Sequence, residues 1–183
     1  MSGHPALFLD RDGNLIRDHH HTCREDQIEP IKGVKEALEA CLRADYRLFI
    51  LTNQSGINRG IFTWEAYEAC NRKMLELLNL PAPGILEIKA APERPDEPSL
   101  YRKPSPRFIQ EMAVKYSLNL GRSWMIGDRR TDWEAGINAA IHACAVRSGK
   151  PLEPVDEVFA HANGVVIHED FPTFVRQELL LRF

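Results

Sequence analysis

The sequence contains no long hydrophobic run. Its first eighteen residues hold one short apolar stretch, residues 6–9, which ends at Asp10. The core of a signal peptide or a membrane span needs a much longer stretch. We therefore expect neither a secretion signal nor a membrane anchor.

Paired cysteines and an excess of basic residues are also missing. The four cysteines, Cys23, Cys41, Cys70 and Cys144, lack the spacing of a metal site or a disulfide framework, so we expect reduced thiols and a cytoplasmic protein. The 23 Lys and Arg residues against 26 Asp and Glu give a net charge of -3, which argues against a general nucleic-acid binder. An anionic ligand would therefore be held by a few specifically placed cations.

The chain alternates short apolar runs with amphipathic stretches. This order predicts a Rossmann-like, doubly wound parallel sheet in a three-layer α/β/α arrangement. The length suits a single domain over residues 1–183, without room for a large inserted cap domain. We expect strands at 6–9, 47–51, 85–90, 123–126, 142–147 and 164–167, and helices at 33–44, 63–78, from 105 onward, at 132–140 and at 171–181.

Polar clusters follow three of the expected strands. Residues 10–13, 52–56 and 127–132 come after the first, second and fourth strands, and Lys103 precedes the helix before the fourth strand. In an open parallel sheet, ligands bind outside the carboxyl ends of the strands. We therefore expect one pocket to collect all four segments.

Asp10 and Asp12 offer two carboxylates directly after the first strand. Both can face one ligand if the backbone turns at Gly13. One carboxylate can then attack phosphorus while the other handles the proton of the leaving oxygen. A helix N-cap or an acidic turn is the simpler alternative for so short a motif.

Asp128 and Asp132 add two acids after the fourth strand. Together with Asp10 they form an oxygen-rich set of the kind that Mg²⁺ prefers. The cation would offset their mutual repulsion and bridge to a phosphate oxygen. Capping of the following helix is the alternative, particularly for Asp132.

The segment from Thr52 to Gly56 supplies hydroxyl, amide and backbone donors that suit phosphoryl oxygens, although such a turn is usually only a turn. Lys103, beside Arg102, supplies a cation, although a lone lysine is as a rule a solvated charge. The required order of all four motifs is far more specific than any one of them.

These motifs resemble those of the haloacid-dehalogenase-like hydrolases. The matching segments are Phe8-Leu-Asp-Arg-Asp-Gly13, Leu51-Thr-Asn-Gln-Ser-Gly-Ile57 with Arg59-Gly60, Arg102-Lys-Pro104, Met125-Ile-Gly-Asp128 and Arg147-Ser-Gly-Lys-Pro151. The resemblance covers residues 6–154 and is greatest to the branch of heptose bisphosphate and histidinol-phosphate phosphatases. Asn14 stands where most members have Thr or Val.

The resemblance implies a role for each matching residue. Asp10 would be the nucleophile and a magnesium ligand, Asp12 the acid/base and a ligand through its backbone carbonyl, and Asp128 the third ligand. Thr52 and Lys103 would steady the transferring phosphoryl group, and Asp132 would support the metal site from behind. Substrate contacts would come from Asp18, His19, His20, His21, Asn53, Gln54, Ser55, Arg102 and Arg129.

The segment 91–101 departs from the branch. Relatives often carry three cysteines and a histidine there as a zinc site, but this segment has three prolines and neither Cys nor His, so we expect no zinc. The run from His19 to His21 with Cys23 suggests a second metal set. Neighbouring side chains in an extended loop point in different directions, so substrate contact and solvated surface are the competing interpretations.

The sequence thus predicts a monomeric, magnesium-dependent phosphatase that acts on a small phosphorylated metabolite through an aspartyl phosphate on Asp10. The resemblance implies that the substrate is a sugar phosphate, D-glycero-D-manno-heptose 1,7-bisphosphate. Histidinol phosphate is the main alternative. A phosphorylated DNA 3′ end and a non-catalytic phosphate-binding role are less favoured, because the chain lacks an evident basic surface and keeps Asp10, Asp12, Lys103 and Asp128.

Overall fold

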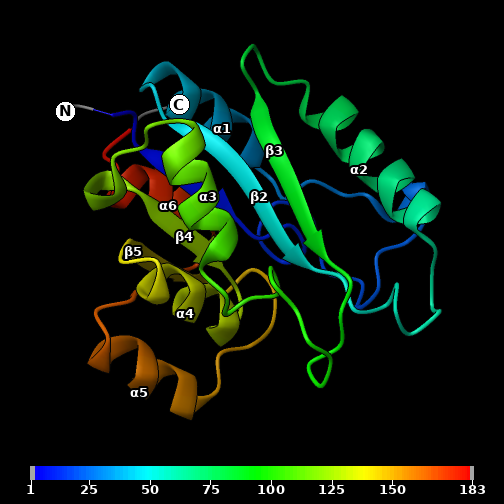
Figure 1. Ribbon diagram of the computed structural model, residues 1–183. Helices are drawn as coiled ribbons and strands as arrows, with labels where there is room; N and C mark the ends of the chain where they lie inside the picture. Colours follow the sequence, from blue (N-terminus) through cyan, green and yellow to red (C-terminus); the bar gives the residue numbers. More distant parts are fainter. Residues whose placement is uncertain (1–2, 182–183) are drawn as a thin grey trace.

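A computed structural model describes residues 3–181 of the chain. Its centre is a six-stranded, all-parallel sheet in the order β3-β2-β1-β4-β5-β6 (Figure 1). The strands are β1 Ala6–Leu9, β2 Arg47–Asn53, β3 Ile85–Ala91, β4 Trp124–Gly127, β5 His142–Val146 and β6 Val166–His168. The helices are α1 Val34–Arg43, α2 Trp64–Leu78, α3 Arg107–Lys115, α4 Arg130–Asn138, α5 Pro154–Ala162 and α6 Phe171–Gln177, with short 3₁₀ turns at Glu25–Gln27 and Leu120–Arg122.

Helices cover both faces of the sheet. Alternate residues of β1 point to opposite faces, so Leu7 and Leu9 pack in the cluster that contains α1, α2 and α6, whereas Phe8 packs with α3 and α4. A third, smaller cluster joins Trp133 of α4 to Ala160 of α5 over β5. The predicted three-layer α/β/α fold, without a large cap domain, is confirmed.

The strand order explains where a ligand can bind. The chain leaves β1 toward α1 on one face and leaves β4 toward α4 on the other face. Neighbouring loops therefore diverge at the carboxyl ends of β1 and β4, and a crevice forms at this topological switch point. The backbone N–H of Asp10 donates to the carbonyl of Ile126 at 2.9 Å, which ties the two strand ends together.

The predicted elements agree with the structure except at several ends and at one helix. Thr63 caps α2 as expected, since its hydroxyl accepts from Ala66 N at 3.3 Å. Helix α4 begins at Arg130, two residues earlier than expected, and α6 ends at Gln177 rather than Leu181. Helix α5 was not predicted, although Pro154 at its first turn is a recognised start signal.

No helix within residues 3–181 is long and apolar enough to cross a bilayer.

Candidate active site

The four polar segments predicted from the sequence converge on one pocket of about 340 Å³. It opens at the carboxyl ends of β1, β2 and β4, as expected for a sheet of this order. Its lining residues are Asp10, Asp12, Asp18, His20, His21, Thr22, Thr52, Asn53, Gln54, Ser55, Arg102, Lys103, Arg129, Arg130, Thr131 and Asp132.

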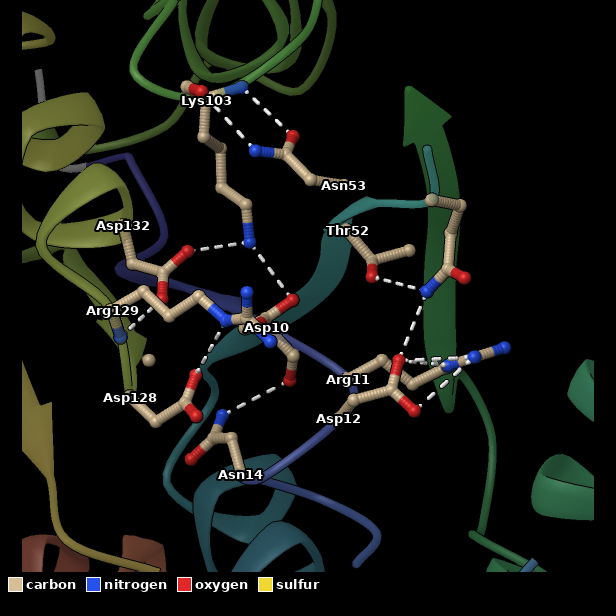
Figure 2. Close-up of polar contacts among 12 residues, drawn as sticks. Asp10, Arg11, Asp12, Asn14, Thr52, Asn53, Lys103, Asp128, Arg129 and Asp132 are labelled. Atoms are coloured by element: carbon tan, nitrogen blue, oxygen red, sulfur yellow. Dashed lines mark hydrogen bonds and ion pairs between the residues drawn. The ribbon is translucent and has the colours of Figure 1, made fainter. Parts of the chain in front are cut away.

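Asp10 lies at the base of this pocket, directly after β1. The residue is 6% exposed, and one carboxylate oxygen, Oδ1, lies 2.8 Å from Lys103 Nζ. The amide of Asn14 donates to the Asp10 carbonyl at 3.1 Å from beneath (Figure 2). Gly13 adopts φ +78°, the left-handed conformation that the predicted turn requires.

Lys103 reaches between Asp10 and Asp132 (Figure 2). Its ammonium lies 2.5 Å from Asp132 Oδ1, and both side chains are almost fully buried. Burial alone would lower the pKa of Lys103, but the charges of Asp10 and Asp132 outweigh that effect and raise it. The lysine is therefore a fixed positive charge beside Asp10.

Asn53 holds the backbone from which Lys103 projects. Lys103 N donates to Asn53 Oδ1 at 3.0 Å, and Asn53 Nδ2 donates back to the Lys103 carbonyl at 3.1 Å. Asn53 closes the carboxyl end of β2, so this pair ties the lysine loop to the sheet. The sequence predicted Asn53 as a substrate contact, and the structure gives it this second role.

Asp10, Asp128 and Asp132 form a buried cluster whose ligand oxygens lie within 4.8 Å of one another. Asp128 Oδ1 is buried without a hydrogen-bond partner among the described residues, and Arg129 Nε lies 3.8 Å from it. A buried carboxylate with a free oxygen and two acidic neighbours is stabilised in its charged form by a bound cation. The oxygen donors suit Mg²⁺, with Lys103 already neutralising part of the charge.

Asp12 lies on the opposite side of the pocket from this cluster (Figure 2). Arg11, which is 1% exposed, donates from Nε to Asp12 Oδ2 at 3.0 Å. Gln54 Nε2 donates to the same oxygen at 2.9 Å and to Thr52 Oγ1 at 2.8 Å. The carboxylate of Asp12 is thus oriented by two side chains and stands apart from the buried acids.

The remaining predicted contact residues lie at or near the pocket mouth. Arg129 Nη2 lies 3.4 Å from Asp18 Oδ2, which connects the loop after β4 to the loop after β1. His20 and His21 line the pocket, but His19 does not; its Nε2 lies 3.9 Å from Glu29 on the surface. Within residues 3–181, the structure does not gather His19, His20, His21 and Cys23 into a metal site.

The segment 91–101, which contains neither Cys nor His, is organised by hydrogen bonds. Glu97 accepts from the backbone N–H of Arg94 at 2.7 Å and from Asn58 Nδ2 at 2.9 Å. Arg102 Nη1 donates to the Glu93 carbonyl at 2.8 Å. These contacts direct the loop along the pocket and fix the guanidinium of Arg102 at its edge.

Sequence reasoning missed several residues that shape the site. Arg11 was not singled out, although an arginine between two acids is a candidate to orient one of them. Asn14 was noted only as a departure from the branch, and it is fully buried under Asp10. Thr22 also lines the pocket, and no motif marked it. Arg130 and Thr131 line it as well; they lie within the predicted cluster 127–132, but the sequence assigned them no role.

The buried acids make stability depend on pH in a defined direction. Burial, followed by Asp10, raises the pKa of Asp128 to about 7, and burial raises the pKa of Asp132 to about 6. Because these pKa values are raised on folding, the contribution of Asp128 and Asp132 to the stability of the metal-free protein is most favourable below the unfolded value of 3.8 and is lost as pH rises to about 7.

Mg²⁺ should reverse this trend, because a bound cation favours the charged carboxylates. We expect Mg²⁺ to raise the melting temperature more at about pH 8 than at about pH 5, as measured by differential scanning calorimetry with and without chelator. Equal shifts at both pH values would contradict the assignment of the cation to these acids.

Comparisons with known proteins agree with the geometry. A sequence profile of the HAD-hydrolase-like family matches residues 100–171. The chain is 37% identical to D-glycero-beta-D-manno-heptose-1,7-bisphosphate 7-phosphatase of Helicobacter pylori, over 84% of this chain and 89% of that protein. It is 32% identical to the protein of the same name from Escherichia coli K12, over 84% of each chain.

A solved structure is also similar over nearly the whole chain. The crystal structure of D,D-heptose 1,7-bisphosphate phosphatase from B. bronchiseptica, complexed with magnesium and phosphate, superposes with a TM-score of 0.82. The two sequences are 26% identical, and the match covers 96% of this chain and 98% of that one.

Proposed function

The chain belongs to the haloacid-dehalogenase-like hydrolases and is a phosphatase of that family, and from this premise we propose that it is a magnesium-dependent sugar-phosphate phosphatase that acts through Asp10. One observation carries the proposal. The buried carboxylate of Asp10 at the end of β1 lies beside the ammonium of Lys103 and belongs, with Asp128 and Asp132, to a cluster of acids that could hold a cation. This is the environment that an anionic nucleophile needs to approach an anionic ester.

In the proposed first step, an Asp10 oxygen attacks phosphorus. A bond forms between that oxygen and phosphorus, and the bond between phosphorus and the ester oxygen breaks, which leaves an aspartyl phosphate. Lys103 and the hydroxyl of Thr52 are the proposed stabilisers of the charge on the transferring group, because both line the pocket that holds Asp10. Their positions are fixed before the reaction, so little reorganisation is needed.

Asp12 is the proposed acid and base. It gives a proton to the leaving alkoxide and then, as a carboxylate, takes one from the water that attacks the aspartyl phosphate. Inorganic phosphate leaves and Asp10 is regenerated. The contacts of Asp12 with Arg11 and Gln54 orient its carboxyl group toward the pocket and away from the other acids.

Asp10, Asp128 and the backbone carbonyl of Asp12 are the proposed ligands of Mg²⁺, with Asp132 holding Lys103 behind them. The ion supplies charge neutralisation between the carboxylates and a phosphate oxygen when bound. The buried Asp128 Oδ1, which has no hydrogen-bond partner among the described residues and lies in a cluster with Asp10 and Asp132, supports the assignment.

The proposed substrate is D-glycero-D-manno-heptose 1,7-bisphosphate. The pocket mouth carries Arg102, Arg129, His20 and His21, polar groups suited to sugar hydroxyls and to a second phosphate. The curated relatives that share a third of the sequence bear the name of this activity, which supports the choice.

A substrate panel tests the proposal. We expect kcat/KM for the heptose bisphosphate to exceed the values for histidinol phosphate and for a 3′-phosphorylated DNA oligonucleotide by about 100-fold or more, because those ligands leave polar groups of the pocket unpaired. Phosphate release is measured with Mg²⁺ present and with chelator. A preference for either of the other two substrates would refute the heptose assignment but leave the phosphatase assignment intact.

A further inference from the structure

The loop after β5 contacts the site without contributing a side chain to the pocket lining. Ser148 Oγ donates to the Gly13 carbonyl at 2.7 Å, at the turn that follows Asp10 and Asp12. Two residues later, Lys150 N donates to Asp128 Oδ2 at 2.8 Å. One short loop therefore joins the turn after β1 to the acid after β4.

Gly149, between these two contacts, lies against the carboxylate itself. A Cβ at Gly149 would overlap Asp128 Oδ2, and a Cβ at Gly13 would lie 2.8 Å from Gly149 Cα. Gly149 does not occupy the left-handed region, so alanine there would meet no backbone strain. What requires glycine at this position is the close approach of the backbone to Asp128.

The loop is itself held in place. Arg147 N donates to the His168 carbonyl at 3.1 Å, which continues the pairing of β5 with β6. The Arg147 guanidinium lies 2.7 Å from Glu157 of α5 and 3.7 Å from Glu169. The peptide between Gly149 and Lys150 is thus a fixed donor and not a mobile loop tip.

The N–H group of Lys150 determines which of the two Asp128 oxygens remains free. Oδ2 is occupied by Lys150 N, whereas Oδ1 is buried without a hydrogen-bond partner in the described chain. Asp10 and Asp132 both repel the Asp128 charge, so an unrestrained side chain would rotate away from them. The single N–H opposes that rotation and keeps Oδ1 available.

We propose that the backbone of Gly149 and Lys150 is a positioning element for magnesium binding, which acts by holding Asp128 in its ligating orientation. The inference rests on the proposed magnesium site. Groups that orient metal ligands typically affect metal affinity by about 10- to 100-fold when removed. The effect should therefore fall on magnesium affinity and not on the chemical step.

Gly149→Ala tests the proposal. We expect the dissociation constant for Mg²⁺, measured by isothermal titration calorimetry without substrate, to rise by about tenfold or more. The Mg²⁺ concentration for half-maximal activity should rise in parallel, while kcat at saturating Mg²⁺ stays within about threefold. The melting temperature in chelator should fall, because the added Cβ would overlap Oδ2, Cγ and Cβ of the buried Asp128 and must displace that side chain. The Mg²⁺ affinity of the folded variant is therefore the deciding readout.

Two further variants separate the possible outcomes. Lys150→Pro removes the N–H donor and should weaken Mg²⁺ binding as Gly149→Ala does. Gly121→Ala is the control, since its Cβ would meet only an ordinary contact at 3.6 Å and it lies at the opposite end of β4. If wild type binds Mg²⁺ and Gly149→Ala binds it equally well, this inference alone is overturned. If wild type does not bind Mg²⁺, the proposed metal site is overturned, and this inference with it.

Discussion

Replacing Asp10 with asparagine should abolish phosphatase activity while leaving the fold intact. Asparagine has the same shape and still offers an oxygen to Lys103, but its amide is not a nucleophile toward phosphorus. Removal of a covalent nucleophile commonly lowers kcat by about 10⁴-fold or more. We expect a loss on that scale in steady-state phosphate release.

The metal-free Asp10→Asn protein should be as stable as wild type or more stable. Asp10 is one of three acids in a buried cluster, and its charge contributes to the raised pKa of Asp128. Neutralising it relieves repulsion, although Mg²⁺ should bind more weakly because one anionic ligand is lost. Urea unfolding with and without Mg²⁺ measures both effects.

Asp45→Asn is the matched control. Asp45 lies just before the amino end of β2, away from the pocket, and its φ of +66° is one that asparagine accepts readily. It should retain full activity. Acid-quenched wild type, digested and analysed by mass spectrometry, should carry a phosphoryl group on the peptide that contains Asp10. An Asp10→Asn variant with more than about a tenth of wild-type activity would exclude covalent catalysis at this residue.

Replacing Lys103 with methionine should cost both activity and stability. The ammonium lies 2.8 Å from Asp10 and 2.5 Å from Asp132, and the lysine side chain is 2% exposed. Removing one partner of a buried ion pair leaves an uncompensated charge, which typically lowers the free energy of unfolding by about 3–5 kcal/mol. Loss of this charge beside the transferring group should also lower kcat by about 10³-fold.

Unfolding in the presence of Mg²⁺ should show whether Lys103→Met loses stability through charge or through packing. If Lys103 stabilises the fold by neutralising the acids, saturating Mg²⁺ should restore part of the lost free energy of unfolding in Lys103→Met. Lys32→Met, on the exposed surface before α1, should change neither kcat nor the free energy of unfolding measurably. A stability loss below about 1 kcal/mol for Lys103→Met would show that the buried charges are not coupled as the geometry indicates.

Much of the fold followed from local patterns in the sequence. The apolar runs that became β1, β2 and β4 have few polar interruptions, and their ends are marked by Asp10, Thr52 and Asp128. The alternation of strands and helices then indicated a parallel sheet, because a helix between two strands returns the chain to the edge at which the first strand began. Helix α5 was not predicted, although its apolar residues are spaced about as clearly as those of α2; of its residues only Ala160 is buried.

The sequence by itself determined which chemical groups are present and the order in which they follow the strands, and this order was enough to predict one pocket with acids, a lysine and hydroxyl donors. Only the tertiary structure decided that Lys103 is sealed between Asp10 and Asp132, that Arg11 orients Asp12, and that the loop after β5 lies against Asp128. The same loop also contacts the turn after β1, where Ser148 and Gly13 are 135 positions apart in the sequence. The energies of such contacts depend on burial, because burial lowers the local dielectric and strengthens the interaction between charges. Burial is a property of the packed chain and not of any single segment.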